Sequence, residues 1–535
     1  MAKKKTTKKT TKKKQAVPDA KGKHLVIVES PAKARTINRY LGDDYAVTSS
    51  VGHIRDLLAK APKGTKKPKD LPEWKKPVPG VDLEHDFKPT YEVLKGKNAL
   101  VTELKKAAKG AKDIWFASDL DREGEAIAWH LAELLGVDPK DAKRVIFNAI
   151  TKKQIEEAFQ HPHPINMDFV NAQQARRILD RVVGYQVSPL LWKRVAGGLS
   201  AGRVQSVAVR IIVEREKEIE AHIPDESWNI TGQFTLNQSD VNGLSSSWAS
   251  FLSTVDERGK GPTRKSMIAF LAEHQCVEGT LVEVGGEPAK FTRPADCSDS
   301  IDNHKEKLLK MATLIGIDSP TIDDVENENG KGPAKHSLTI SGDIKEGTTY
   351  EVSDIAQKDN TVRPPAPFIT SSLQASASTV LGFGAKRTMR AAQALYEGVR
   401  IKGEGQVGLI TYMRTDSTHL SLDAIQAART YIDKSFGAAY LPDKANVYTS
   451  SNESAQEAHE AVRPTDVSRH PSSLPASLDE DQRRLYTLIW SRFVACQMTP
   501  AKWHRTEIFF KRTDEDTGAI FKVSGRTLAF DGFYK

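Results

Sequence analysis

Cysteine is scarce in this sequence, and the three present, Cys276, Cys297 and Cys496, are far apart and form no Cys-x-x-Cys pair. This spacing argues against a zinc ribbon and a disulfide framework, so we expect a reducing compartment. Long apolar runs are also missing: no stretch approaches the roughly 18 residues of a membrane span, and no apolar segment follows the N-terminal lysines. We therefore expect an intracellular protein without a membrane segment or signal peptide.

Net charge is small once one segment is set aside. The formal net charge is +9, but residues 1–14 hold eight lysines, and 9 − 8 leaves about +1 for the rest. Any nucleic-acid surface must then come from local clusters of Arg and Lys, with the tail adding a salt-sensitive attraction to phosphates. Such a tail is equally typical of a disordered, solubilising extension. No P-loop motif is present to suggest a nucleotide-driven reaction.

The first motif is an apolar run, His24 to Val28, followed by Glu29, Ser30 and Pro31. A helix cap and a first-turn proline directly after such a run indicate a buried strand that leads into a helix. A carboxylate at the end of a parallel strand faces the ligand crevice, and Lys33, one helical turn on, faces the same opening. Alone, the segment is as readily a capped loop.

The second motif crowds carboxylates at the end of another expected strand. Ile114 to Ala117 leads into Asp119, Asp121, Glu123 and Glu125, and a helix is expected from Ala126 to Leu135, ended by Gly136. Close carboxylates repel each other by about 4 kcal/mol per pair at an effective dielectric of 20, so something must offset them. Alternating Asp residues suit Mg²⁺. The alternative is a solvated acidic loop at a helix N-terminus.

The third motif, GLITYMRTDST at 408–418, is expected to be a buried strand that presents Tyr412. A tyrosine hydroxyl attacks phosphorus poorly unless cations favour the phenolate and neutralise the transition state. Arg414, two residues on in an extended segment, would lie on the same face as Tyr412. The polar residues 415–418 are expected to cap a following helix. An ordinary strand with a solvated arginine is the alternative.

A fourth segment, residues 171–185, is amphipathic at helical spacing and rich in arginine. Arginines next to the flat faces of Tyr185 and Trp192 suit single-stranded nucleic acid, and the glycine turn at 197–205 suits a phosphate. A surface helix with an Arg176–Asp180 ion pair is the plainer interpretation.

The remaining segments carry less chemistry. Residues 57–80 should form an exposed excursion, residues 227–363 a β-rich region with surface insertions, and residues 367–398 two helices separated by Gly382 and Gly384. Strands should return after Pro500.

Two of these segments, HLVIVESPAKARTINRYLG and ASDLDREGEAIAWHLAE, resemble the TOPRIM domain of the type IA family of bacterial DNA topoisomerases. GLITYMRTDST resembles that family's active-site tyrosine motif. Similarity runs from about His24 to Tyr534, apart from much of 230–363. TOPRIM alone would also admit primases and nucleases, whereas the tyrosine segment does not occur in those.

The resemblance implies a multidomain α/β and α+β protein arranged as a toroid. Its expected parts are a disordered Lys-rich tail (1–22), a TOPRIM parallel-sheet domain (23–163), an incomplete helical DNA-binding domain (164–226), an incomplete β-rich arch (227–366 and 500–535) and a helical tyrosine domain (367–499). Family members normally continue beyond the position that corresponds to Lys535, so we expect a fragment or an incomplete sequence.

The resemblance also implies an Mg²⁺-dependent, ATP-independent enzyme that relaxes negatively supercoiled DNA through a 5′-phosphotyrosine intermediate. The implied catalytic residues are Tyr412, Arg414, Glu29 and Lys33, and the implied metal ligands are Glu29, Asp119, Asp121 and Glu123. The implied DNA contacts are His53, Arg176, Arg177, Asp180, Tyr185, Trp192, Ser200, Ala201, Gly202, Arg203, Val204, Gln205, Arg414 and His459. We expect a monomer acting on single-stranded DNA in the bacterial cytoplasm, associated with the nucleoid. A TOPRIM nuclease or primase, or a single-strand-binding fragment without catalysis, remains the rival hypothesis.

Overall fold

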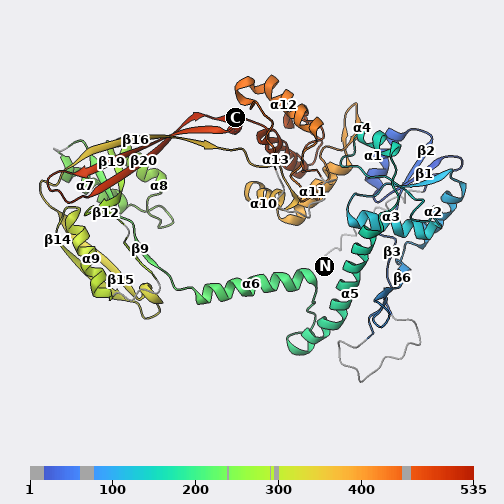
Figure 1. The fold of residues 1–535 in the computed structure, drawn as a ribbon, viewed down its shortest axis with the longest axis horizontal. Coiled ribbons are helices and arrows are strands. Elements are labelled where there is room, and N and C mark those ends of the chain that lie inside the picture. The colour runs from blue at the N-terminus through green and yellow to red at the C-terminus, as the bar shows by residue number, and fades with distance from the viewer. Residues whose placement is uncertain (1–16, 61–76, 238–239, 290, 295–299, 449–459) are drawn as a thin grey trace, which may run out of the picture. The chain divides into compact units, whose positions relative to one another are not determined.

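The computed structural model describes residues 17–60, 77–237, 240–289, 291–294, 300–448 and 460–535, and these belong to two compact units (Figure 1). Unit 1 comprises residues 1–212 and 364–499. Unit 2 comprises residues 213–363 and 500–535. Each unit therefore combines two separate stretches of the chain.

A four-stranded parallel sheet organises the first half of unit 1. Its order is β2-β1-β7-β8, with β2 at Tyr45–Ser49, β1 at His24–Val28, β7 at Asp113–Phe116 and β8 at Lys143–Arg144. Its helices are α1 (Pro31–Leu41), α2 (Asn98–Gly110), α3 (Arg122–Leu135) and α4 (Lys152–Gln160). Leu25, Ile27 and Phe116 from the strands share one buried core with Ile127 from α3. The predicted parallel sheet is confirmed, because apolar runs of this kind fit strands buried on both faces.

Helix caps fix where the polar strand ends begin. Ser30 Oγ accepts a hydrogen bond from Lys33 N at 3.2 Å and Pro31 is the first residue of α1, as the sequence predicts. Gly136 ends α3 in a left-handed conformation, φ 73°. The predicted start of α3 at Ala126 is wrong by one turn, because Asp121 caps the helix by accepting from Gly124 N at 2.8 Å.

Two short hairpins and one long helix complete this half, and a second long helix continues from unit 1 into unit 2 between residues 212 and 213. The hairpins pair β3 (Arg55–Leu57) with β6 (Tyr91–Val93), and β4 (Val81–Asp82) with β5 (Lys88–Pro89). The predicted amphipathic helix lies inside α5 (Met167–Arg194), and α6 follows at Arg203–Ala221. Most of the predicted excursion, residues 61–76, lies outside the described residues. Helix α6 has no buried side chain, although it carries several Val and Ile residues.

The tyrosine region of unit 1 is mainly helical, as predicted. Its elements are α10 (Thr370–Leu381), α11 (Ala385–Glu397), β17 (Val399–Ile401), β18 (Gly405–Val407), α12 (Leu422–Phe436) and α13 (Glu480–Cys496). Gly382 ends α10 at φ 69° and Gly384 is the N-cap of α11, which confirms the predicted break. The helix after the tyrosine segment is capped by Ser421, so the prediction that residues 415–418 cap it is wrong.

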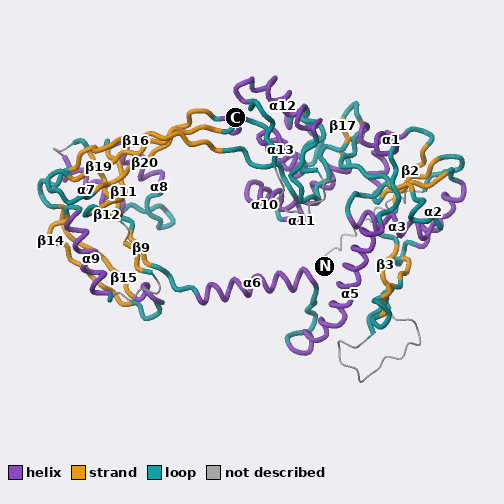
Figure 2. The backbone as a smooth tube through the Cα atoms, in the orientation of Figure 1, coloured by secondary structure: helices purple, strands orange, loops and turns teal. Residues whose placement is uncertain are grey.

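Unit 2 is β-rich, as predicted. Its main sheet has the order β10-β11-β20-β19-β16, with β10 at Thr231–Thr235, β11 at Cys276–Val284, β20 at Ile520–Phe530, β19 at Ala501–Arg512 and β16 at Tyr350–Val362. Figure 2 shows β16, β19 and β20 as long antiparallel neighbours. The other strands are β9 (Glu226–Trp228), β12 (Glu287–Pro288), β13 (Phe291–Arg293), β14 (Ile317–Glu326) and β15 (His336–Ile344).

Three helices of unit 2 were not predicted from the sequence. They are α7 (Val241–Leu252), α8 (Arg264–Glu273) and α9 (Ile301–Leu314). Helix α7 lies in the region, residues 227–363, for which the sequence predicts only strands and surface insertions. Leu308 and Met311 of α9 pack with Leu281 and Phe521 of the main sheet, so α9 is part of the core.

Candidate active site

Two acidic strand ends, one half-buried and one buried, share one lysine. Glu29 follows β1 and Asp119 follows β7, and the wholly buried Lys33 amino group donates hydrogen bonds to both carboxylates. Adjacent parallel strands bring these carboxylates together, as the sequence predicts. A buried cation requires anionic partners. Lys33 is therefore a fixed part of the carboxylate cluster.

The same burial divides the protons unevenly between the two carboxylates. Burial raises the pKa of Asp119 to about 7, although the Lys33 charge opposes this shift. Burial also acts to raise the pKa of Glu29, but hydrogen bonding with Asp119 and the Lys33 charge outweigh it and lower that pKa. The two groups titrate as a pair. Near neutral pH the pair can hold one proton beside an ionised carboxylate.

A buried arginine that the sequence analysis missed fixes the end of β7. Arg144 Nη1 donates to Ser118 O at 2.8 Å and Nη2 to Asp119 O at 2.6 Å, while Nε donates to Glu125 at 2.9 Å. Gly124 contributes a close approach, because a Cβ there would lie 2.0 Å from Asp119 O. The strand end is therefore held by its backbone, which leaves the Asp119 carboxylate to Lys33.

The tyrosine segment is buried, but it is not the predicted strand. Residues 408–412 lie outside the named strands, and they hydrogen-bond to three different parts of unit 1. Leu409 N donates to Leu395 O at 2.8 Å, Thr411 N to Arg463 O at 2.9 Å, and Tyr412 N to Asn148 O at 2.8 Å. The contact with Asn148 ties the tyrosine directly to the segment that follows β8.

Tyr412 and Arg414 converge on one oxygen of the acidic cluster. Tyr412 Oη donates to Asp121 Oδ2 at 2.6 Å, and Arg414 Nη1 lies 3.4 Å from the same oxygen. Burial raises the pKa of Tyr412 well above its ordinary value, with Asp119 and Asp121 adding to the shift and Arg414 opposing it. The hydroxyl therefore keeps its proton in this arrangement, and Asp121 is placed to accept it. The Arg414 side chain is 57% exposed, which leaves it accessible to a ligand.

The acidic residues and Arg414 line one open cavity of about 320 Å³. Its lining residues are Glu29, Asp119, Asp121, Glu123, Met389, Arg390, Gln393, Met413 and Arg414. Across the described ranges, no group of three or more His, Cys, Asp or Glu side chains is arranged so that it could hold a metal ion. Four carboxylates around an open cavity still fit Mg²⁺, which binds few protein ligands and keeps several waters. The sequence analysis missed Met389, Arg390 and Gln393, which come from α11.

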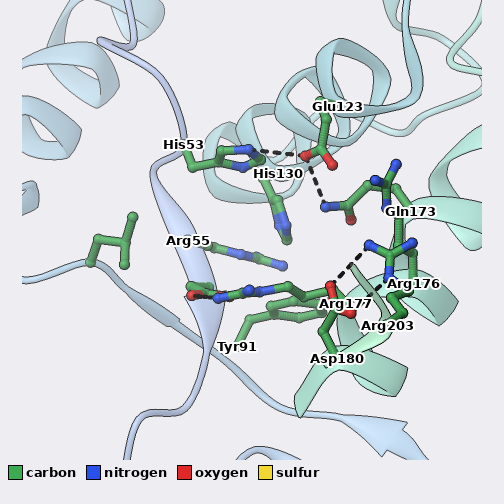
Figure 3. A pocket seen from close by; sticks show the side chains of 12 residues that line it. His53, Arg55, Tyr91, Glu123, His130, Gln173, Arg176, Arg177, Asp180 and Arg203 are labelled. Atoms are coloured by element: carbon green, nitrogen blue, oxygen red, sulfur yellow. Dashed lines mark hydrogen bonds and ion pairs between the residues drawn. The ribbon is translucent and has the colours of Figure 1, made fainter. Parts of the chain in front are cut away.

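A second cavity, of about 380 Å³, gathers the predicted arginines between β3, β6, α3 and α5 (Figure 3). Its lining residues are His53, Arg55, Asp56, Tyr91, Leu94, Glu123, His130, Gln173, Arg176, Arg177, Asp180 and Arg203. A third cavity, of about 640 Å³, is lined by residues that include Asp121, Glu123, Arg176 and Arg414. Glu123 lines all three cavities, so they adjoin one another around this residue.

Ion pairs inside the second cavity differ from the predicted ones. Asp180 accepts from Arg203 at 2.7 and 3.0 Å, so the predicted Arg176–Asp180 pair is wrong. The hydrogen bond from Arg203 lowers the pKa of Asp180. Arg177 donates both to Asp56 Oδ1, at 2.8 Å, and to Asp56 Oδ2. The sequence does not predict Asp56 as a site residue, because its partner Arg177 lies 121 positions further along the chain.

The remaining predicted DNA contacts differ in accessibility. Tyr185 and Trp192 are 45% and 52% exposed, and Arg181 lies over the Tyr185 ring at 5.5 Å. In the glycine turn Ser200, Val204 and Gln205 are exposed, Arg203 is half-buried, and Ala201 and Gly202 are buried. His459 lies outside the described residues.

None of the helices in the described ranges is long and apolar enough to cross a membrane. Comparison with protein families gives two matches. A Toprim domain model matches residues 24–150, and a DNA topoisomerase model matches residues 164–268 and 311–535. The first match contains the carboxylates, and the second contains α5 and Tyr412.

Individual proteins of similar sequence carry the name DNA topoisomerase 1. The chain is 43% identical over 529 residues to DNA topoisomerase 1 of Pseudomonas aeruginosa, covering 96% of this chain and 50% of that protein. It is 44% identical over 526 residues to DNA topoisomerase 1 of Escherichia coli, with the same coverage of 96% and 50%. It thus spans about half the length of the curated relatives it matches.

A solved structure matches as well. Full-length topoisomerase I from Thermotoga maritima aligns with a TM-score of 0.63 and 33% identity, covering 95% of this chain and 66% of that one. The topoisomerase model spans the tyrosine segment as well as α5, which a nuclease or primase with a TOPRIM domain would not explain. This chain therefore belongs to the type IA family of bacterial DNA topoisomerases.

Proposed function

We propose that unit 1 cuts and reseals one DNA strand through Tyr412. The observation that carries this proposal is the convergence of Tyr412 Oη and Arg414 on Asp121, beside the Glu29–Lys33–Asp119 cluster. Tyr412 Oη would form a bond to phosphorus while the bond from phosphorus to the 3′-oxygen breaks. A phosphotyrosine ester keeps the energy of the broken bond, so resealing needs no nucleotide.

Proton transfer follows from the same contacts. Asp121 accepts the Tyr412 hydrogen bond and would take its proton as the hydroxyl attacks. Arg414 would neutralise charge on the phosphorus oxygens. The Glu29–Asp119 pair holds a proton near neutral pH and would deliver it to the departing 3′-oxygen. We propose Glu29 as a catalytic residue and assign the proton to the pair. Lys33 would contact the scissile phosphate only after its buried amino group leaves the two carboxylates that it binds.

Mg²⁺ would be held by Glu29, Asp119, Asp121 and Glu123, the carboxylates that line the open cavity. When bound, it supplies positive charge to phosphate oxygens in a site that otherwise carries four carboxylates. Tyr412, Arg414 and Lys33 provide the attacking oxygen and two cations whether or not the metal is present.

The adjoining cavities offer a path for single-stranded DNA. Arg176 lines both the arginine-rich cavity and the one that reaches Arg414. The N-terminus of α10 opens onto the same path through Thr370 and Ser371, where helix amides favour phosphate. Tyr185 and Trp192 would stack on unpaired bases. We assign the proposed function to four domains: a TOPRIM domain (23–163), a DNA-binding domain (164–226), an arch (227–366 and 500–535) and a tyrosine domain (367–499).

We further propose that the whole protein relaxes negatively supercoiled DNA by passing a strand through the transient break. We expect a monomer in the bacterial cytoplasm, associated with the nucleoid, because its substrate is there.

The test is covalent capture of DNA. A single-stranded oligonucleotide labelled at its 3′ end is incubated with the protein and Mg²⁺, denatured and separated by size. We expect a labelled band at the size of the protein for the wild type and none for Tyr412→Phe. Tyr486→Phe is the matched control, because its buried hydroxyl donates to Arg469 O at 2.8 Å, away from the cavity. It should form the band.

Other outcomes separate the rivals. Mg²⁺-dependent cleavage of DNA that persists in the Tyr412→Phe variant would indicate a TOPRIM nuclease. Tight binding without any band in the wild type would indicate a binding fragment without catalysis.

A further inference from the structure

The turn that carries His53 contains a residue in an unfavourable conformation. Val51 has φ 57° and its side chain is 53% exposed. β-branched residues seldom adopt the left-handed region, because the side chain crowds the backbone. Because the Val51 side chain is exposed, no burial of apolar surface offsets the cost of this conformation. Backbone strain of this kind persists only where neighbouring groups enforce it, and it is concentrated at functional sites.

A second local preference is violated nearby, at Lys97. This residue is the N-cap of α2 and makes no side-chain cap hydrogen bond. The N-terminus of a helix carries partial positive charge, so a cation is unfavourable there, and lysine is not a preferred N-cap residue. The Lys97 amino group instead donates to Ser50 O at 3.1 Å and Val51 O at 2.7 Å. Lys97 therefore holds the two carbonyl groups that lie on either side of the strained φ angle of Val51.

The turn is also fixed to the acidic strand end. Ser50 N donates to Val28 O and Gly52 N donates to Glu29 O, both at 2.8 Å. Ser50 Oγ donates to Gly52 O at 2.8 Å. These bonds connect the conformation of the turn to the backbone of Glu29, a residue of the catalytic cavity.

His53 follows directly and lies opposite Glu123. His53 Nε2 is 3.2 Å from Glu123 Oε2, which also accepts from Gln173 Nε2 at 3.1 Å (Figure 3). Glu123 lines all three cavities and His53 lines the arginine-rich one, so the position of His53 sets one wall of the proposed DNA path. A turn that relaxed to an ordinary conformation at Val51 would change the direction of the chain two residues before His53.

We propose that Lys97 is a positioning residue, which clamps the strained turn at Val51 so that His53 stays against Glu123 and facing the DNA strand. The proposal rests on the proposed function, since it treats His53 as a DNA contact. Local preferences are broken at Val51 and at Lys97, and the two residues meet at one pair of carbonyl groups, which is the pattern expected where structure serves function. Lys97 itself acts through His53 and does not contact the reacting atoms.

The test is a double-mutant cycle on single-strand binding. Every variant is made in the Tyr412→Phe background, so that binding is measured without cleavage, with an unmodified oligonucleotide as the probe. His53→Ala and Lys97→Met should each weaken binding by roughly 3- to 10-fold, the size of one lost hydrogen bond. The double variant should bind no worse than His53→Ala alone. Lys95→Met, which removes an exposed lysine two residues away, controls for the loss of charge.

A second cycle tests the strain. Glycine adopts positive φ without cost, so Val51→Gly should remove the need for the clamp. We expect Val51→Gly/Lys97→Met to recover most of the binding that Lys97→Met loses. Lys97→Arg keeps a donor and should bind like the parent. In ¹⁵N-histidine spectra, Lys97→Met should shift the His53 ring signals. The melting temperature of Lys97→Met should equal that of Lys95→Met.

Three results would overturn the proposal: no loss of binding in Lys97→Met, a full additional loss on top of His53→Ala, or no recovery with Val51→Gly. None of these bears on covalent capture by Tyr412, so failure of the clamp and failure of the proposed function are distinguishable.

Discussion

Asp119 shows how single residues prepare the site. Its backbone carbonyl is bound by Arg144, its carboxylate by Lys33, and its close contact with Gly124 leaves no space for a side chain there. A carboxylate held in this way keeps its position without solvent, as the proposed proton transfer requires. We therefore expect Gly124 and Arg144 to be needed for the reaction as well as the acid itself.

Gly124→Ala tests this packing. The new Cβ would lie 2.0 Å from Asp119 O, so the strand end or α3 must shift. We expect a loss of about 2 kcal/mol or more in unfolding free energy and loss of covalent capture. Urea unfolding and the gel assay measure the two effects. Gly110→Ala is the control, because its Cβ would meet atoms no closer than 3.5 Å, and it should be neutral or slightly stabilising.

Arg390 is the second prediction at this scale. It lines the catalytic cavity and lies 4.0 Å from Asp481, whose two oxygens already accept from Arg387 at 2.8 and 2.6 Å. Its side chain is 78% exposed, so it can reach a phosphate. Arg390→Gln should reduce the slope of log affinity against log salt by about 0.7 for single-stranded DNA. An unchanged slope would show that Arg390 contacts no phosphate. Lys153→Gln, an exposed cation paired with Asp423, should leave the slope unchanged.

At the scale of elements, the strongest sequence patterns located the site. The apolar run at His24–Val28 and the Ser-Pro cap are local signals, so β1, α1 and Glu29 could be predicted. The chemistry of Tyr412 marks it in the sequence, but its segment is not a strand, because its residues hydrogen-bond to three different segments, at Leu395, Asn148 and Arg463, and no continuous ladder forms.

Contacts of this kind also explain what the sequence could not show. Arg144, Asp56 and Arg390 interact with partners that are not their neighbours in sequence, so no local pattern marks them as site residues. The helices α7 to α9 of unit 2 lie in a region without strong periodicity, where only tertiary packing decides the structure.

The β-rich unit supports a prediction about pH. Arg512 is buried and donates to both oxygens of Asp514, at 2.9 and 2.6 Å, and this lowers the pKa of Asp514 to about 2. Because the folded pKa lies below the unfolded value of about 3.9, the stabilisation is complete above that pH and is lost as pH falls through about 2. We expect Asp514→Asn to cost about 1 kcal/mol at pH 7.

Hydrogen exchange of β19 amides at pH 7 and urea unfolding at pH 2 to 7 measure this effect. The difference between wild type and variant should shrink steadily as the pH falls from about 4 toward 2. Asp516→Asn is the control, since Asp516 is 89% exposed and pairs with Lys511 at 3.3 Å. Equal destabilisation at all pH values would contradict an electrostatic origin.

At the scale of the whole molecule, the chemistry is assigned to unit 1. The parallel sheet, helix α5 and the tyrosine region all belong to this unit, although they come from two stretches of the chain. Covalent capture should therefore need only unit 1, whereas strand passage would involve the rest of the protein. The toroidal arrangement expected from the family stays a prediction.

Metal removal should separate two stages of the reaction. The proposed cleaving groups Tyr412, Arg414 and Lys33 belong to the protein, whereas the four carboxylates that line the cavity would repel the phosphates of a second DNA end unless a cation is bound there. Addition of EDTA should therefore slow resealing of captured DNA more than capture itself. Resealing is measured by adding an acceptor strand with a 3′-hydroxyl to the captured complex and following release of the label. Equal resealing with EDTA and with Mg²⁺ would contradict a metal at these carboxylates.

The central claim is that Tyr412 carries the DNA. The most direct measurement is tandem mass spectrometry of the captured complex after digestion with trypsin and nuclease. We predict a single nucleotide 5′-phosphate attached to Tyr412, in the peptide that ends at Arg414. A nucleotide on any other residue, or cut DNA with no modified peptide, would contradict the account.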